Sequence, residues 1–124
     1  MNSSHEDEFF SSIIPSDFRV RQIMYKLRSE PRLRLATLAV LVNLSPSRLR
    51  HLFKEQTGVR IGMFAKEIQL QRARGLLLDT LKPLKAIGED IGISDTANLS
   101  RHFKQRFGYT PRGYRRLFKE QQPF

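Results

Sequence analysis

The chain has 124 residues, and its 22 Lys and Arg outnumber its 12 Asp and Glu, which gives a net charge of +10 and a pI near 10.7. This length predicts one domain or two very small ones, and the charge favours a polyanionic partner, with nucleic acid as the first candidate. The absence of cysteine excludes a disulfide framework, a thiol nucleophile and a cysteine-based zinc site. The apolar runs are too short to cross a bilayer, so we expect a cytoplasmic protein with no membrane partner.

Residues 1–17 contain acidic side chains but no Lys or Arg, and their apolar residues follow no period. We predict that they form a flexible arm or the stub of a linker. The basic character therefore belongs to residues 18–124.

Helix signals dominate the rest of the chain, and strand signals are absent. The first helix opens near Pro15 and ends before Pro31. Its apolar residues follow the i, i+3, i+4, i+7 spacing of one helix face: Val20, Ile23, Met24 and Leu27.

Residues 35–57 predict a helix-turn-helix. A short helix stops at Asn43, a residue type that tolerates the left-handed conformation of a tight turn. Ser45 is a good N-cap, Pro46 suits the first helical position, and Gly58 ends the second helix. A short helix, a tight turn and another short helix make this motif.

The same pattern recurs over residues 84–107. One residue is inserted in the second turn, where Gly92 stands in place of Asn43. A small residue is needed at Ala39 and at Gly88, because the two helices of each motif should cross closely there. The offset is 49 before the turn and 50 after it: Leu35 pairs with Leu84, Leu38 with Ile87, Ala39 with Gly88, Val42 with Ile91, Leu49 with Leu99, Phe53 with Phe103, Lys54 with Lys104, Gly58 with Gly108 and Phe64 with Tyr114.

A spacer helix is predicted over residues 62–79, between the two motifs. Its eighteen residues would span roughly 27 Å. Gly75 would either bend this helix or permit close packing. We expect one broad apolar stripe, made of Phe64, Ile68, Ala73, Leu76 and Leu77.

A final helix is predicted over residues 111–120, beginning after Thr110, with Tyr114, Leu117 and Phe118 facing inward. The expected fold is therefore all-α, with about seven helices. Two helix-turn-helix subdomains would be joined by the long spacer helix.

The segment IGEDIGISDTANLSRHFKQRFGYTPRGYR, residues 87–115, resembles the C-terminal DNA-binding domain of AraC/XylS-type bacterial transcription regulators. The resemblance covers nearly everything from Val20 to Leu117. Three positions depart from the family pattern: Gly88 replaces the usual alanine, Ile93 replaces phenylalanine, and Gln69 stands where many members place an arginine. The last departure puts one DNA-backbone contact in doubt.

The resemblance implies sequence-specific binding of double-stranded promoter DNA, with two successive major grooves read by one domain. It also implies a bacterial regulator of transcription, which we expect to be an activator, with RNA polymerase as a second partner and a location on the nucleoid. Most members carry a separate sensing domain before this one. We expect either a stand-alone regulator or a piece of a longer protein.

The exposed faces of the two recognition helices supply the candidate base contacts. Arg can grip guanine with two hydrogen bonds, Asn can do the same for adenine, and Ala can touch a thymine methyl group. The predicted base-contacting residues are Ser47, Arg50, His51, Thr96, Ala97, Asn98 and Arg101. Two interpretations stay open for Ser47, Thr96 and Asn98, which are equally suited to capping a helix, and His51 suits either a base contact or an ordinary surface position.

Phosphate contacts, which position a protein without specifying sequence, are predicted at Arg48, Lys54, Ser100, Lys104 and Arg112. His102 pairs with an inward residue of the first copy, so we expect it between helices. No enzymatic activity, metal site or cofactor is predicted, because the chain has no HExxH, Walker or GxGxxG motif.

Two alternatives rest on the positive charge alone. The chain would then be a nonspecific architectural or RNA-binding protein, or a basic helical protein acting on membranes or acidic partners. Neither needs two matched recognition helices.

Overall fold

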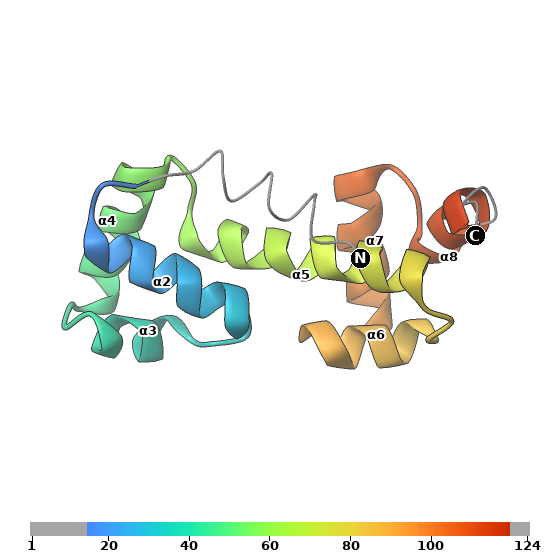
Figure 1. Cartoon of the computed structure of the whole chain (residues 1–124), viewed down its shortest axis with the longest axis horizontal. Helices are drawn as coiled ribbons and strands as arrows, with labels where there is room; N and C mark the ends of the chain where they lie inside the picture. The colour runs from blue at the N-terminus through green and yellow to red at the C-terminus, as the bar shows by residue number, and fades with distance from the viewer. Residues whose placement is uncertain (1–14, 120–124) are drawn as a thin grey trace. The chain divides into compact units, whose positions relative to one another are not determined.

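The computed structural model describes residues 15–119, and this part of the chain contains seven α-helices, one π-helical turn and no strand (Figure 1). The prediction of an all-α fold is confirmed. The described residues divide between Ile68 and Gln69 into two compact units. Each unit has its own hydrophobic core.

The first unit contains one complete helix-turn-helix. Its elements are α2 (Phe18–Ser29), α3 (Leu35–Leu41), α4 (Pro46–Thr57) and the beginning of α5 (Ile61–Asp79). The core is built from apolar side chains three or four residues apart on each helix, which is the spacing of one helix face. Its fully buried members include Val20, Ile23, Leu27, Leu38, Leu49, Phe53, Phe64 and Ile68.

The second unit repeats the motif and adds a short C-terminal segment. It contains the remainder of α5, followed by α6 (Leu84–Ile91), α7 (Thr96–Phe107), α8 (Pro111–Tyr114) and the π-helical turn η1 (Arg115–Lys119). Its hydrophobic core is built from Leu70, Ala73, Leu77, Ile87, Ile91, Leu99 and Phe103.

An aromatic pair at the same place in each unit confirms the predicted repeat. Phe53 on α4 meets Phe64 on α5 edge to face, with ring centroids 5.3 Å apart and planes at 69°. Phe103 on α7 meets Tyr114 on α8 at 5.5 Å and 81°. Such pairs contribute about 0.5 to 1.5 kcal/mol beyond the area that they bury. Both copies therefore join the recognition helix to the following helix in the same way.

Left-handed residues end the corresponding helices in both copies. Asn43 and Gly92 have φ values of +58° and +92° in the two turns. Gly58 and Gly108 end the recognition helices with φ values of +78° and +86°. These conformations favour Asn and Gly over other residue types, as the sequence predicted.

The residue inserted in the second turn follows a main-chain hydrogen bond that both copies make, and it precedes the N-cap of the recognition helix. The Leu44 amide donates to the Ala39 carbonyl at 3.0 Å, and the Ile93 amide donates to the Gly88 carbonyl at 2.8 Å. The copies therefore correspond up to Leu44 and Ile93. Ser94 is the extra residue, because it separates Ile93 from the cap of α7.

The longer second turn places main chain directly against α6. A Cβ atom built on Gly88 would overlap the main-chain carbonyl oxygen of Ile93 and would touch the Leu99 side chain at 3.6 Å. The prediction that Gly88 must be small is confirmed, and the close neighbour is the turn itself. Glycine fits at this position, whereas alanine occupies the equivalent position 39 in the shorter first turn.

Helix α5 buries two different faces along its length, so the expectation of one broad stripe was wrong. Phe64 and Ile68 belong to the first core, whereas Leu70 and Leu77 belong to the second. Two residues advance an α-helix by about 200°, so the buried side changes between Ile68 and Leu70. The helix continues without a break through Gly75, which is buried.

The C-terminal segment differs from the predicted helix over residues 111–120. The α-helix ends at Tyr114 and continues as the π-helical turn η1, and residue 120 lies outside the described residues. Tyr114 and Phe118 pack with ring centroids 4.5 Å apart. Leu117 was expected to face inward but is 40% exposed.

Two cations of η1 instead bind the end of α5. Arg115 donates from Nε to the Leu77 carbonyl at 3.0 Å and from Nη2 to the Thr80 carbonyl at 3.2 Å. Lys119 donates from Nζ to the Leu78 carbonyl at 2.7 Å. The last carbonyls of a helix lack partners within the helix, so these side chains satisfy them. Partial burial lowers the pKa of Arg115 from its ordinary value.

Replacement of Gly88 by alanine should destabilise the protein. The added Cβ would force the turn away from α6, and overpacking of this kind costs about 1 to 3 kcal/mol. Gly62→Ala is the matched control, because a Cβ there meets nothing within 4 Å and should stabilise the helix by up to about 1 kcal/mol. Urea unfolding, monitored by circular dichroism, gives the free energy of unfolding of both variants. Equal or higher stability of Gly88→Ala would contradict the packing described for the second turn.

Arg115→Ala should lower the free energy of unfolding by about 2 kcal/mol, because charge-assisted hydrogen bonds to the end of α5 are lost. The neighbouring Arg116 is exposed, and its replacement by alanine should stay within about 0.5 kcal/mol of the parent protein. Thermal unfolding of the two variants compares them directly. If both variants unfolded alike, Arg115 would not be what holds the end of α5.

Candidate nucleic-acid interface

Helix α4 has a buried side and a polar side. Leu49 and Phe53 are fully buried. The opposite side exposes the four side chains that the sequence assigned to it, Ser47, Arg50, His51 and Lys54. The unit therefore presents a recognition helix whose outer face is polar and positively charged.

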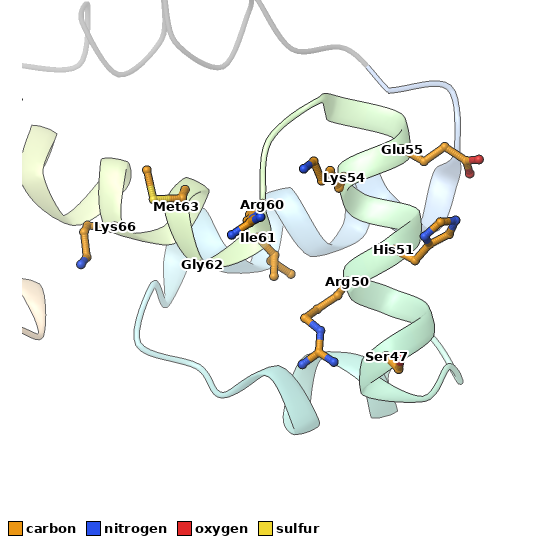
Figure 2. A pocket seen from close by; sticks show the side chains of 10 residues that line it. All are labelled: Ser47, Arg50, His51, Lys54, Glu55, Arg60, Ile61, Gly62, Met63 and Lys66. Atoms are coloured by element: carbon orange, nitrogen blue, oxygen red, sulfur yellow. The ribbon is translucent and has the colours of Figure 1, made fainter.

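A hollow of about 1040 Å³ lies between this face and the start of α5 (Figure 2). Five residues of α4 line it, together with residues 60–63 and 66 of the following segment. Among the described residues that line it, Lys and Arg supply four side chains, and Glu55 is the single acid. Clustered cations of this kind raise the local concentration of anionic partners.

The side chains around the hollow divide between two sides of α4. Figure 2 shows Arg50 and Lys54 on the same side of the helix as Arg60, whereas His51 and Glu55 project to the other side. The two sides follow from the helix period, because residues four apart are neighbours on its surface. Arg50 is therefore the predicted base-contacting residue of α4 that lies beside the other cations.

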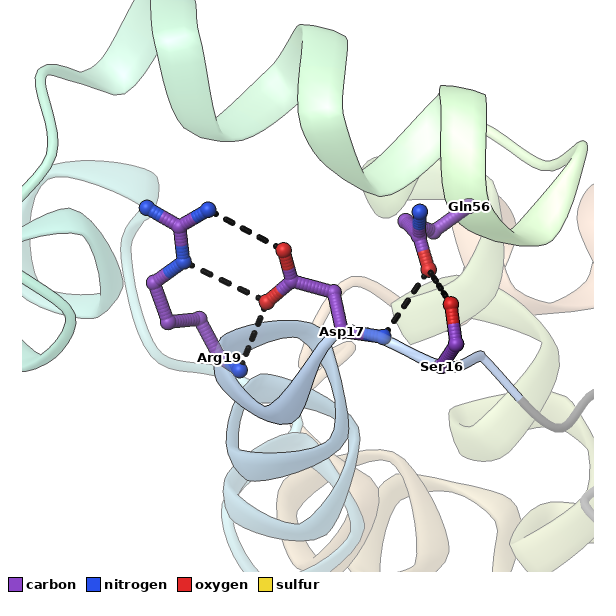
Figure 3. Close-up of polar contacts among 4 residues, drawn as sticks. All are labelled: Ser16, Asp17, Arg19 and Gln56. Carbon is purple, nitrogen blue, oxygen red and sulfur yellow. Dashed lines mark hydrogen bonds and ion pairs between the residues drawn. The ribbon is translucent and has the colours of Figure 1, made fainter.

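Polar contacts to α2 hold the end of α4. The Gln56 Oε1 atom accepts hydrogen bonds from Ser16 Oγ at 3.2 Å and from the Asp17 amide at 3.0 Å (Figure 3). Asp17 also caps α2 by accepting from the Arg19 amide at 2.8 Å. Ser16 and Asp17, which the sequence analysis placed in an arm, thus help to fix the recognition helix, and residues 1–14 of that arm lie outside the described residues.

An exposed ion pair accompanies this cap. The Arg19 side chain binds both carboxylate oxygens of Asp17, at 3.2 Å and 3.0 Å. The side-chain hydrogen bond from Arg19 lowers the pKa of Asp17, and the same contact raises the pKa of Arg19. The pair therefore extends the ionised state of the capping carboxylate to lower pH than an unpaired aspartate would reach.

Helix α7 presents the corresponding face of the second unit. Ala97, Arg101 and Lys104 are exposed. Thr96, Asn98 and Ser100 are half-buried on the same helix. Each face carries two Lys or Arg side chains, but their positions differ: Ser100 stands at the position equivalent to Arg50, and Arg101 stands at the position equivalent to His51.

Two of the predicted base-contacting residues on α7 bind each other. Arg101 donates from Nη2 to Asn98 Oδ1 at 2.5 Å. This contact orients the guanidinium group along the helix surface while leaving other donors free to act. Arg101 and Asn98 are therefore a coupled pair, which the sequence did not indicate.

The residues that cap α4 and α7 are not those for which the sequence left a capping role open. Ser45 caps α4 by accepting from the Arg48 amide at 3.1 Å. Asp95 caps α7 by accepting from the Ala97 amide at 3.0 Å and the Asn98 amide at 3.2 Å. The interpretation of Ser47, Thr96 and Asn98 as the N-caps was wrong for all three. The side chains of Ser47 and Thr96 therefore remain available for another role, whereas Asn98 Oδ1 accepts from Arg101.

The remaining predicted phosphate contacts lie near helix starts. Arg48 is exposed in the first turn of α4, and Arg112 is exposed in α8. His102, which was expected between helices, is half-buried on α7. Gln69 donates from Nε2 to the Ile91 carbonyl at 3.1 Å, so it binds the end of α6 within the second unit.

Sequence reasoning missed Arg60, Met63 and Lys66 as part of this surface. The offset of 50 could have indicated Lys66 alone, which it pairs with Arg116, because it pairs Arg60 with Thr110 and Met63 with Gly113. Charged residues at the start of a helix have no periodic signal of their own.

A duplicated helix-turn-helix whose recognition helices expose polar faces defines a DNA-binding domain. A family model described as a helix-turn-helix domain matches residues 38–117. The chain is 34% identical over 104 residues to the arabinose operon regulatory protein of Salmonella typhimurium, a match that covers 82% of this chain and 37% of the relative.

Two further similarities agree with this one. The HTH-type transcriptional activator RhaR of Yersinia pseudotuberculosis is 34% identical over 70 residues, which cover 56% of this chain and 24% of RhaR. The solved C-terminal domain of AraT, a response regulator from Geobacillus stearothermophilus, superposes with a TM-score of 0.78 at 27% identity. That superposition covers 86% of this chain and 93% of the AraT domain.

The chain belongs to the AraC/XylS family of DNA-binding transcription regulators and corresponds to its C-terminal DNA-binding domain. It spans just over a third of the length of the arabinose operon regulatory proteins that it matches. No helix within residues 15–119 is both long enough and apolar enough to cross a membrane.

Proposed function

We propose that this chain binds a specific sequence of double-stranded promoter DNA by placing α4 and α7 in two successive major grooves. The main observation behind this proposal is that the two helix-turn-helix motifs share the same packing but expose different side chains on their recognition helices. The inner residues and caps correspond between the copies, whereas Arg50 corresponds to Ser100 and Ser47 to Ala97. Such a pair of helices suits an asymmetric site, because the two faces offer different hydrogen-bonding groups.

The proposed base contacts are made by the exposed groups of the two helices. On α4 they are Ser47, Arg50 and His51, and on α7 they are Thr96, Ala97, Asn98 and Arg101. Arg50 and Arg101 would each hold a guanine edge through two hydrogen bonds. Arg48, Lys54, Ser100, Lys104 and Arg112 would bind phosphates on either side of the grooves and fix the register.

The length of α5 is compatible with two grooves. A helix of 19 residues is about 28 Å long, and successive major grooves on one face of DNA are about 34 Å apart. The bodies of the two motifs would supply the remaining distance. One chain would then cover the whole site without a second copy.

Activation of transcription and contact with RNA polymerase are the further parts of this proposal. They are supported by two relatives, an operon regulatory protein and a transcriptional activator. A sensing domain would be supplied by additional sequence, since the relatives are longer than this chain. The alternative function, nonspecific binding by charge alone, predicts equal affinity for every DNA sequence and needs no matched motifs.

Arg50→Ala should weaken binding to the specific site by about 1 to 3 kcal/mol and relax preference at one or two base pairs, because a bidentate contact is lost. Arg101→Ala should do the same in the other groove. Lys104→Ala is the contrasting variant and should weaken all sequences alike. Titrations against the site and single-base variants measure both effects. Full discrimination by Arg50→Ala would show that the face of α4 does not read bases.

Insertion of about five base pairs between the two DNA segments should reduce affinity toward that of a single half-site. Half a helical turn moves the second major groove to the opposite side of the duplex, beyond the reach of α7. Gel-shift titrations on the original and inserted sites test this. Affinity that did not change after the insertion would mean that only one of the two motifs contacts DNA.

A further inference from the structure

Three cations that line the hollow beside α4 have no partner among the residues that the structure describes. Within residues 15–119, the side chains of Arg50, Lys54 and Arg60 make no hydrogen bond or ion pair. Glu55, the acid of the hollow, points to the other side of α4 (Figure 2). The positive charge on this side is therefore available to an external anion.

The lining also has an apolar part. Ile61 forms part of it and is only 8% exposed, whereas Met63 is 63% exposed beside the cations. Gly62 has no side chain, and a Cβ there would meet nothing within 4 Å, so a bulky ligand can approach the main chain of α5 closely. The surface thus alternates between positive charge and apolar contact over a wide, open hollow.

A DNA strand presents a complementary alternation of anionic phosphate and apolar deoxyribose. We propose that this hollow binds the backbone of the strand that borders the major groove occupied by α4. Arg60, together with Lys54, binds phosphates, and Met63 packs against a sugar. This inference rests on the proposed function, and it adds the start of α5 to the DNA-binding surface.

The second unit carries charge at the equivalent element. The offset of 50 places Arg112 opposite Gly62 and Arg116 opposite Lys66, and both arginines are exposed. Arg115, which lies between them in the sequence, donates hydrogen bonds to carbonyls at the end of α5. The segment after each recognition helix is thus cationic in both copies, although different residues supply the charge.

The test compares Arg60→Ala with Arg21→Ala, an exposed arginine on α2 that does not line the hollow. Affinities are measured for specific and random duplexes over a range of salt concentrations. Loss of one phosphate contact should reduce the slope of log affinity against log salt by about one. It should also lower the affinity for both duplexes by the same factor. Arg60→Lys should retain the slope, and Arg21→Ala should leave it unchanged. Circular dichroism confirms that each variant is folded.

The position of the contact is tested on the DNA. Methylphosphonate substitution removes the charge of one phosphate at a time. Substitution at the phosphate bound by Arg60 should lower the DNA affinity of the parent protein but not that of the Arg60→Ala variant. Met63→Ala should lower affinity without changing the salt slope, because the contact that it removes is uncharged. Full affinity of Met63→Ala would overturn the sugar contact.

Three results would overturn the phosphate assignment. The salt slope of Arg60→Ala could equal that of the parent, or this variant could lose preference at particular base pairs instead of binding all sequences more weakly. Calorimetry could also show that inorganic pyrophosphate binds through Arg60 while the DNA slope stays the same, which would indicate a small-anion site. These results differ from failure of the proposed function, in which the parent protein would show no preference between specific and random DNA.

Discussion

An edge-to-face contact joins a phenylalanine of each recognition helix to an aromatic residue of the helix that follows it. The orientation of each recognition helix within its unit depends on this contact. Phe53 meets Phe64 in one unit, and Phe103 meets Tyr114 in the other. Both phenylalanines are completely buried, so the opposite side of each recognition helix must face outward. The same contact brings the start of α5 beside α4, which is how Arg60 comes to share a hollow with Arg50.

The two copies keep this framework and differ in the turn that precedes the recognition helix. The second turn is longer by Ser94, and its main chain comes so close to α6 that position 88 has no room for a Cβ atom. Glycine at that position is therefore an adjustment to the longer turn. The outer faces carry no such packing constraint, so they can differ between the copies without cost to the core.

The sequence predicts most of the fold because the signals involved are local. Apolar spacing, Asn43 and Gly58 define the first motif, and a constant offset identifies the second. It did not predict that α5 changes its buried face between Ile68 and Leu70, because each half makes only a short stripe. It also missed Arg115 at the end of α5 and Arg60 beside α4, since these contacts join residues through the tertiary fold and leave no periodic pattern.

In the proposed complex, two dissimilar helices of one chain read one asymmetric DNA site. Selection of binding sequences from a random duplex library, followed by sequencing, tests this directly. Two enriched segments of different sequence should appear, with centres about one helical turn, or roughly 10 base pairs, apart. A palindrome, a single enriched segment or no enrichment would contradict it.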